Sequence, residues 1–335
     1  MSLPEPLSRS KPVFAAPMAG GPSTPALVIA AARAGHFAQL AAGYKAVDAL
    51  RTDIGAVREA GVDLFGVNLF VPNIHRIDDA AYARYWERIA PSGTSMPAKT
   101  EDDDAWGAKV ELLLADPVPA VSFTFGLPER TVIDAFRDAG TLVLQTVTSA
   151  AEARSAIDAR IDVLVVQGYG AGGHSGVWEA GVLPAAVPLV DLVRGTREAV
   201  AAPIVATGAV SRRDQVAELL DGGADAVAVG TALLRARESG TSSVHRSALA
   251  DPAFARTELT RAFTGRPARA LVNRFAEAHS AHAPSGYPAI HHLTRAMRAD
   301  AAARGDSGGV HLWAGEGWRD AREAPAAEIL RDLTP

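Results

Sequence analysis

DVLVVQGYGAGGHSG, residues 162–176, joins a strand pattern directly to a glycine-rich loop that carries one histidine. Residues 163–167 form a short apolar run, which is typical of a strand buried on both faces. Four glycines lie between Gln167 and His174, and glycine lets the backbone approach a ligand closely. Histidine is the side chain whose ordinary pKa lies nearest neutrality. The segment therefore predicts a buried strand that ends in a ligand-binding loop.

The same alternation of short apolar runs and alanine-rich segments recurs along the chain. Strands are predicted at 13–16, 37–41, 65–69, 120–123, 141–146, 163–167, 203–207 and 226–229. Helices are predicted at 25–34, 47–60, 128–139, 150–159, 188–200 and 212–220. Eight strand units, each expected to be followed by a helix, predict an α/β protein with a (β/α)8 TIM barrel. An open doubly wound sheet is disfavoured, because no G-x-G-x-x-G turn follows the first strand.

Two stretches fall outside this repeat. Residues 70–106 form a long excursion, helical at 82–86 and loop-like at 91–104, which we interpret as a functional cover. Residues 237–310 carry arginine-rich helical segments and predict a smaller, mainly helical lobe over the C-terminal face of the barrel. The predicted division is a cofactor-binding barrel at 1–236, with 311–335 returning to it, and a substrate-covering lobe at 237–310.

The composition narrows the class of protein. The 335 residues are 48% hydrophobic and carry a net charge of −5, so neither nucleic acid nor an anionic membrane surface is an expected partner. There are no cysteines, which excludes disulfides, thiolate metal sites and cysteine nucleophiles. The N-terminal residues lack an apolar signal core, so we expect a soluble cytoplasmic protein, as a monomer or homodimer.

Several strand ends carry residues suited to a cofactor. Gly208 follows the seventh strand, and Gly230 with Thr231 follows the eighth, which predicts a phosphate cradle. The turn at 16–21, which contains Met18, can lie against a flat ring system. The carboxamides of Asn68 and Gln167 could bond the edge of a heterocycle or simply satisfy backbone groups.

Of the nine histidines, His174 alone follows a predicted barrel strand in a glycine-rich loop, so it is the candidate catalytic or substrate-binding residue. Ser122, at the end of the fourth strand, is predicted to line the pocket. Nucleophilic catalysis is disfavoured, since there is no G-x-S-x-G elbow. No metal site is predicted, because the histidines at 279–292 lack a carboxylate cluster at a recognised spacing.

Together, several motifs resemble those of the nitronate monooxygenases, formerly called 2-nitropropane dioxygenases. They are APMAGG (16–21), AGYK (42–45), FGVNLF (65–70), SFTFG (122–126), QGYGAGGHSG (167–176), ATGA (206–209), VGT (229–231) and LWAGEGW (312–318). The resemblance covers nearly the whole chain. It departs at Gly170, where the family usually has Glu, and at Ser175, where Arg is frequent.

The resemblance implies a TIM barrel that binds FMN non-covalently. Met18, Asn68, Gln167, Gly172 and Gly173 would surround its ring and ribityl chain. Gly208, Gly230 and Thr231 would hold its phosphate, and His174 would be the active-site histidine. Ser122, Lys45 and Ser175 would line the substrate pocket.

The implied reaction is oxidative denitrification. A nitronate, formed from a nitroalkane or supplied as such, gives an electron to FMN, O2 traps the radicals, and the products are a carbonyl compound and nitrite. His174 would either accept the α-proton of a neutral nitroalkane or, as a cation, hold the nitronate. The alternatives are an FMN-dependent NAD(P)H reductase of the same superfamily, for quinones or enoyl-acyl-carrier proteins, and a flavin-free barrel for a phosphorylated metabolite.

Overall fold

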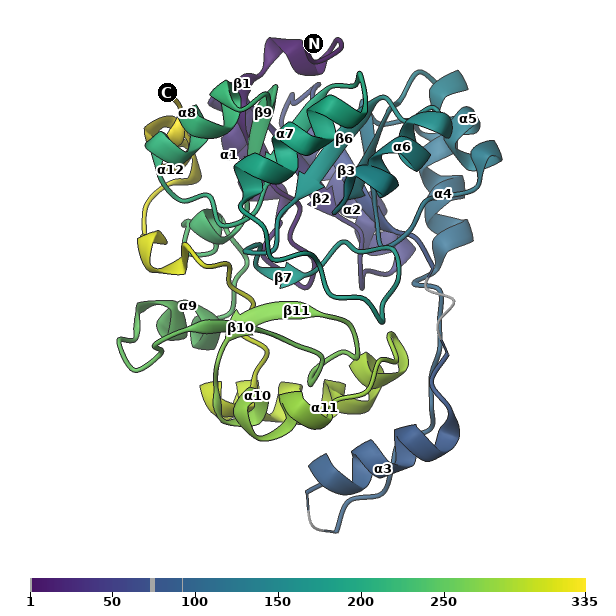
Figure 1. The fold of residues 1–335 in the computed structure, drawn as a ribbon, viewed down its shortest axis with the longest axis vertical. Coiled ribbons are helices and arrows are strands. Elements are labelled where there is room, and N and C mark those ends of the chain that lie inside the picture. The colour runs from purple at the N-terminus through teal and green to yellow at the C-terminus, as the bar shows by residue number, and fades with distance from the viewer. Residues whose placement is uncertain (1, 73–75, 92) are drawn as a thin grey trace.

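A closed barrel forms the upper part of the molecule in Figure 1, a computed structural model that describes residues 2–72, 76–91 and 93–335. Within the described residues, eight parallel strands pair in the order β1-β2-β3-β4-β5-β6-β8-β9, and β9 pairs back with β1. They are β1 (Lys11–Ala15), β2 (His36–Ala41), β3 (Gly66–Phe70), β4 (Ala120–Thr124), β5 (Leu142–Val147), β6 (Val163–Gln167), β8 (Ile204–Thr207) and β9 (Ala226–Val229). The predicted TIM barrel is confirmed.

Helices surround the barrel and bury their apolar faces against it. They are α1 (Pro25–Arg33), α2 (Val47–Glu59), α4 (Trp106–Ala115), α5 (Arg130–Asp138), α6 (Ala150–Asp158), α7 (Leu189–Ala199), α8 (Arg213–Asp221) and α12 (Ala326–Leu333). In α5, Ile133 and Phe136 are fully buried three positions apart, as the helical period requires. α1 begins where Thr24 Oγ1 accepts a hydrogen bond from Leu27 N, with Pro25 at its first position.

Two strand–helix pairings differ from the prediction. The helix that covers the barrel after β3 is α4, which the sequence reading missed, whereas the predicted helix near residue 82 lies elsewhere. No α-helix directly follows β9: the chain makes a short 3-10 turn, η2 (Thr231–Leu233), and then leaves the barrel. α12 instead packs between α1 and α8. The helix that covers a barrel strand need not follow it directly along the chain. Its apolar face has only to pack against the barrel at that position.

The lobe lies below the barrel in Figure 1 and contains strands as well as helices. Its elements are α9 (Ser243–Ala250), β10 (Thr257–Thr260), β11 (Ala268–Leu271), α10 (Arg274–His279) and α11 (Ala289–Ala303), with short 3-10 turns η3 (Ser280–His282) and η4 (Ser307–Gly309). The two strands were not predicted, since each has only four residues, TELT and ARAL, which is too short for a clear strand pattern. They form because β11 pairs with both β10 and β7 (Gly173–His174), which is part of the loop after β6.

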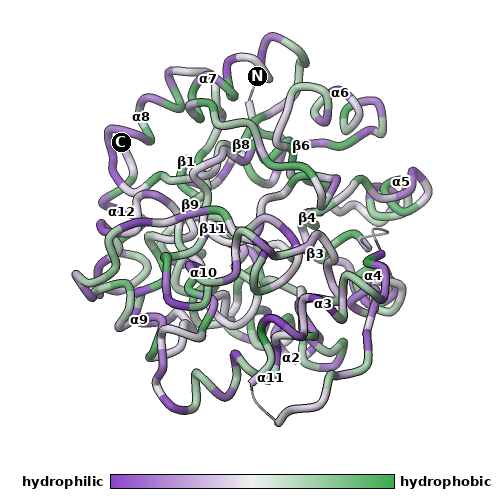
Figure 2. The backbone as a smooth tube through the Cα atoms, turned by 60° about the horizontal axis from the view of Figure 1, so that its bottom comes forward, coloured by the Kyte–Doolittle hydropathy of each residue, from purple (hydrophilic) through white to green (hydrophobic). Residues whose placement is uncertain are grey.

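One further helix belongs to the lobe by its contacts. α3 (Asp79–Ile89) packs Tyr82, Tyr85 and Ile89 against Ile290 and Leu293 of α11. The Tyr85 hydroxyl donates to Ala262 O at 2.7 Å. Figure 2 looks onto this side and shows α3 and α11 there. We propose that the predicted division at 236/237 and 310/311 holds with α3 added to the lobe; residues 73–75 and 92 of the predicted cover lie outside the described part.

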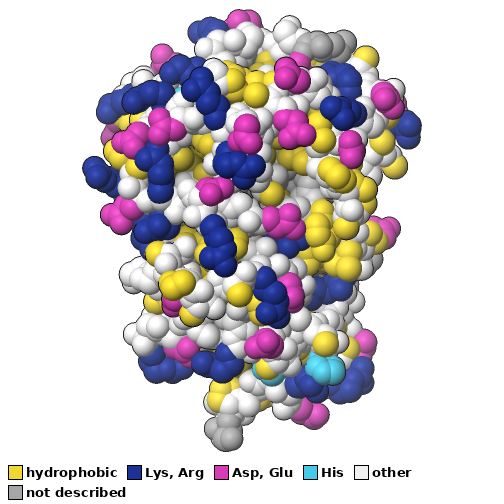
Figure 3. Space-filling view, turned by 60° about the vertical axis from the view of Figure 1, so that its left-hand side comes forward, with side chains coloured by type: hydrophobic (Ala, Val, Ile, Leu, Met, Phe, Trp, Pro, Cys, Tyr) yellow, Lys and Arg dark blue, Asp and Glu magenta, His cyan; other side chains and the backbone are white. Residues whose placement is uncertain are grey.

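The surface carries charges of both signs. On the face shown in Figure 3, lysines and arginines are interspersed with aspartates and glutamates, without a continuous basic region. None of the described helices combines the length and apolar character that crossing a membrane requires.

Candidate active site

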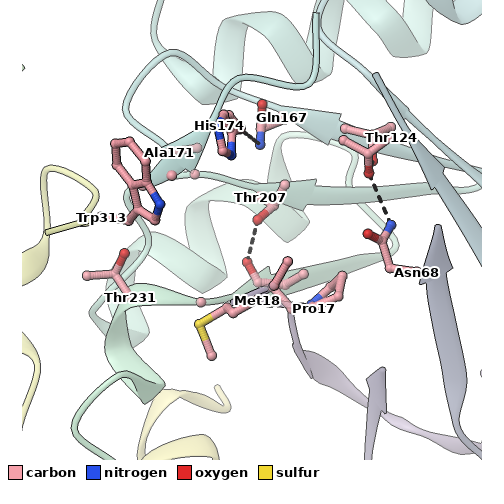
Figure 4. A pocket seen from close by; sticks show the side chains of 18 of the residues that line it. Pro17, Met18, Asn68, Thr124, Gln167, Ala171, His174, Thr207, Thr231 and Trp313 are labelled. Carbon is pink, nitrogen blue, oxygen red and sulfur yellow. Dashed lines mark hydrogen bonds between the residues drawn. The ribbon is translucent and has the colours of Figure 1, made fainter. Parts of the chain in front are cut away.

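A cavity opens where the carboxyl ends of the barrel strands meet the lobe, and we call it the barrel-mouth cavity. Figure 4 shows Asn68, Gln167 and Thr207, from β3, β6 and β8, facing one space with Met18 and Trp313. These residues come from strands far apart in sequence, because in a parallel barrel all the carboxyl ends share one rim. The position agrees with the predicted catalytic face.

Most of the predicted site residues line this cavity. They are Met18, Asn68, Ser122, Gln167, Gly172, Gly173, His174, Gly208, Gly230 and Thr231. The other two, Lys45 and Ser175, do not line it. Lys45 lines a neighbouring cavity, where Nζ is paired with Asp53 of α2. The placement of Ser175 is a correction: its side chain is buried and lines neither this cavity nor the neighbouring one, because Ser175 N donates to Pro267 O at 2.8 Å within the lobe contact.

A chain of polar side chains crosses the bottom of the cavity. Asn68 Nδ2 donates to Ser122 Oγ at 2.8 Å and to Thr124 Oγ1 at 3.0 Å. Ser122 Oγ donates in turn to Gln39 Oε1 at 2.7 Å. The prediction did not include Gln39 or Thr124. The hydrogen bonds hold the Asn68 amide in one orientation beside the cavity.

Gln167 holds the loop that carries His174. Its Oε1 accepts from Gly176 N at 2.6 Å, and its Nε2 donates to His174 O at 3.3 Å. The carboxamide therefore bonds the backbone at the histidine and two residues after it, which is one of the two uses that the sequence left open.

The end of the cavity near β8 and β9 has the features of an anion site. Gly208 and Ala209 both adopt positive φ, at +127° and +58°. Thr231 Oγ1 accepts a hydrogen bond from Gly315 N at 3.0 Å, so its own proton is available to an anion. His245, from α9 of the lobe, also lines the cavity, and its buried Nε2 has no partner within the described residues. Burial lowers the pKa of His245 to about 4.

His174 lies at the junction of barrel and lobe. It pairs with Ala268 of β11, and its Nε2 lies 3.0 Å from Thr264 Oγ1. Its ring contacts Phe125, Tyr287 and Trp313, with centroids 5.3–5.8 Å away. The side chain is partly exposed, and it lines the cavity. Burial, with Arg266 and Arg298 nearby, lowers its pKa to about 3, so His174 is neutral at neutral pH.

A second cavity adjoins the first, and we call it the lobe-side cavity. Ala19, Gly20, Tyr44, His174, His311 and Trp313 line both. Its remaining wall includes Lys45 and Asp102 at the barrel and Tyr287, His291 and Arg298 from the lobe. His174 therefore faces two joined spaces, one over the barrel strands and one against α11.

The sequence reading missed most of the lobe-side wall. Tyr44 and Trp313 lay inside motifs that supported the resemblance but received no role. His291, Arg298 and His311 carry no local signal, because they lie among other basic residues on a lobe helix and the segment after it. Among the residues that the structure describes, no group of three or more His, Asp or Glu side chains is placed to hold a metal ion.

Comparisons with known proteins agree with this arrangement. The family model described as nitronate monooxygenase matches residues 4–335. A nitronate monooxygenase from Pseudomonas aeruginosa is 35% identical, with 98% of this chain and 96% of that protein covered.

Two solved structures are also similar. A nitroalkane oxidase from Streptomyces ansochromogenes is 45% identical, with a TM-score of 0.92 and coverage of 96% of this chain and 94% of that one. FabK from Thermotoga maritima is 23% identical, with a TM-score of 0.75 and coverage of 98% and 92%, which is a likeness of fold alone. The chain belongs to the nitronate monooxygenase family, whose members are flavin-dependent oxidoreductases.

Proposed function

We propose that this protein oxidises alkyl nitronates, and neutral nitroalkanes after loss of their α-proton, with O2 to carbonyl compounds and nitrite. The observation that carries the proposal is the placement of His174, a neutral ring between the barrel-mouth cavity and a second cavity lined by the lobe. Family membership and the likeness to a nitroalkane oxidase support it.

We propose FMN as the flavin, held in the barrel-mouth cavity. Met18, Gly172 and Gly173 would lie against the ring system and ribityl chain, with Asn68 and Gln167 near its polar atoms. Gly208, Gly230 and Thr231 would hold the phosphate. The unpartnered His245 Nε2 supports this fit, since a buried imidazole nitrogen requires a polar partner. When bound, the flavin supplies the redox chemistry by taking electrons from the substrate and passing them to O2.

His174 would handle the proton at the substrate carbon. The Thr264 hydroxyl donates to Arg266 O at 3.3 Å, so it accepts from His174, whose Nε2 then carries the ring proton. The neutral ring keeps Nδ1 as an acceptor, which fits proton abstraction. The other role, a cationic ring that holds the nitronate, would require protonation that burial disfavours.

The test begins with the absorbance spectrum of the purified protein and the identity of the flavin released on denaturation. FMN is the expected flavin. Addition of an alkyl nitronate in air, without NADH or NADPH, should then yield nitrite. An FMN-loaded protein that forms no nitrite from several nitronates would refute the proposal. Rapid anaerobic bleaching of the flavin by NADH or NADPH would instead indicate a reductase.

A further inference from the structure

One buried cation in the wall of the lobe-side cavity has no carboxylate partner among the described residues, whereas Arg295, which also lines the cavity, is exposed. Arg298 of α11 is only 6% exposed and lines this cavity. Its Nε donates to Thr294 Oγ1 at 3.0 Å, and its Nη2 donates to His291 O at 2.9 Å. Across residues 2–72, 76–91 and 93–335, no aspartate or glutamate forms an ion pair with it. The positive charge of Arg298 is therefore buried without a counter-charge.

The two histidines beside Arg298 do not change this charge. Arginine can only donate, so Nδ1 of His311, at 3.1 Å from Nη1, and Nδ1 of His291, at 3.4 Å from Nη2, act as acceptors. Both rings then carry their proton on Nε2 and are neutral. Burial, followed by the charge of Arg298, holds the pKa of each below its ordinary value. Arg298, His291 and His311 together therefore carry one net positive charge, and the two histidine rings offer N–H donors beside it.

Several other arginines of the lobe pair with carboxylates, whereas in the described part of the chain Arg298 and Arg266 are buried without one. Arg256, Arg269, Arg274 and Arg304 each pair with a carboxylate. Three aspartates line the cavity, of which Asp102 lies 2.9 Å from His292 and Asp104 pairs with Lys109 at 2.8 Å; within the described residues none of the three, Asp103 included, pairs with Arg298. A buried cation without a counter-charge is costly, and an anion bound in the cavity would lower that cost.

A second buried guanidinium strengthens the positive field at this place. Arg266 is fully buried behind Phe125, with its guanidinium carbon 4.0 Å from the ring centroid. It donates to the carbonyls of Ser175 and Val177, and in the described part of the chain its Nη1 has no partner. Since Phe125 separates it from the cavity, Arg266 adds charge but does not form the wall.

We infer that Arg298 binds the anionic nitro group of the substrate in the lobe-side cavity and so makes the protein select nitronates over neutral nitroalkanes. The inference rests on the proposed function. The four hydrogen bonds of Arg298 leave one of its five N–H groups, on Nη1, for the substrate. The Nε2–H of His311, which lines both cavities, is the second donor. Held there, the substrate carbon faces the space that His174 shares with the barrel-mouth cavity.

The test compares Arg298→Met with the wild type on flavin-loaded protein. Loss of a charge-assisted hydrogen bond should raise KM for an alkyl nitronate about 10- to 100-fold. KM for the matching neutral nitroalkane should change by less than about threefold, since that substrate carries no charge for Arg298 to recognise. Arg298→Lys, which keeps the charge, should recover part of the nitronate KM.

The matched control is Arg304→Met at the end of the same helix, because Arg304 is exposed and paired with Asp300. It should leave both KM values unchanged. Unaltered nitronate KM in a flavin-loaded Arg298→Met protein would overturn the inference, and so would equal increases for both substrates.

A nitrate titration, followed by the absorbance of the bound flavin, provides a readout without turnover. Arg298→Met should weaken nitrate binding at least tenfold, and Arg298→Lys covers the case in which the methionine variant fails to fold. Unchanged nitrate affinity would count against the inference. If the wild type forms no nitrite from nitronates, the proposed function fails, while the titration still decides whether Arg298 binds an anion.

Discussion

The protonation state of the His174 ring decides which chemistry is available at this site. His174 lies between two cavities, and burial with two nearby guanidinium groups keeps it neutral. The Thr264 hydroxyl further selects the tautomer with Nδ1 as acceptor. An acceptor suits a base that removes a proton, and it leaves the binding of a negative charge to Arg298. The two roles that the sequence assigned to one histidine thus separate onto two residues.

His174→Asn tests the proton-transfer role. The variant should keep its flavin but lose kcat with neutral nitroalkanes by about 100-fold or more, since asparagine cannot act as a base. Preformed nitronates need no proton abstraction, so their turnover should fall much less. Steady-state nitrite formation with each pair of substrates checks this. Equal losses on both would reject the base role.

At the scale of elements, two glycine-rich segments cross at the active site. The loop 168–173 after β6 lies against the segment 314–317, which returns from the lobe. A Cβ on Gly172 would lie 2.4 Å from Gly315 N, and a Cβ on Gly315 would lie 2.9 Å from Gly170 O. At Gly170, the carboxylate of Glu316 fills the adjoining space. Close backbone contact holds this loop in place, together with Arg269, which donates to Tyr169 O at 3.2 Å.

Gly172→Ala tests the crossing. The methyl group meets backbone atoms that cannot rotate away, so the two segments must separate. We expect the free energy of unfolding to fall by about 1–3 kcal/mol, with weaker flavin binding. Urea unfolding and flavin titration measure the two effects.

Gly195→Ala in α7 is the control, because a Cβ there meets nothing within 4 Å. It should be neutral or stabilise the protein by up to about 1 kcal/mol, as expected for a glycine inside a helix. Similar behaviour of the two variants would show that the crossing does not constrain the loop.

At the scale of the whole molecule, closure of the lobe over the barrel buries several histidines in their neutral form. The pKa of His174 falls to about 3 and that of His245 to about 4, in both cases chiefly through burial. His291 and His311 shift in the same direction for the same reason. In the unfolded chain each ring titrates near its ordinary value of 6.5.

This arrangement predicts a stability that depends on pH. Above about pH 6.5 the rings are neutral in both states, so their contribution is constant. As the pH falls towards about 4, the unfolded chain binds protons that the folded protein excludes, and each such ring costs about 1.4 kcal/mol per pH unit. Urea unfolding between pH 7.5 and 5.5 should therefore show falling stability. His245→Gln should reduce the slope, and stability that rises on acidification would contradict the prediction.

The sequence alone determined the barrel and much of its rim. Strand and helix periods are local properties, so the eight strands could be placed to within about two residues. The glycines and carboxamides of the site follow directly from strand ends, and in a parallel barrel every such end reaches one rim. His174, Asn68 and Gly230 could therefore be assigned to one cavity before any contact was known.

Only the tertiary structure decided what faces that rim. His174 meets Thr264, 90 residues away, and β7 exists as a strand only because β11 lies beside it. His245 and Arg298 looked like ordinary polar residues in the sequence, and Ser175 is buried outside the cavity that it was predicted to line. Burial and the absence of a counter-charge are properties of packing between distant segments, so no local pattern could reveal the buried cation of the lobe.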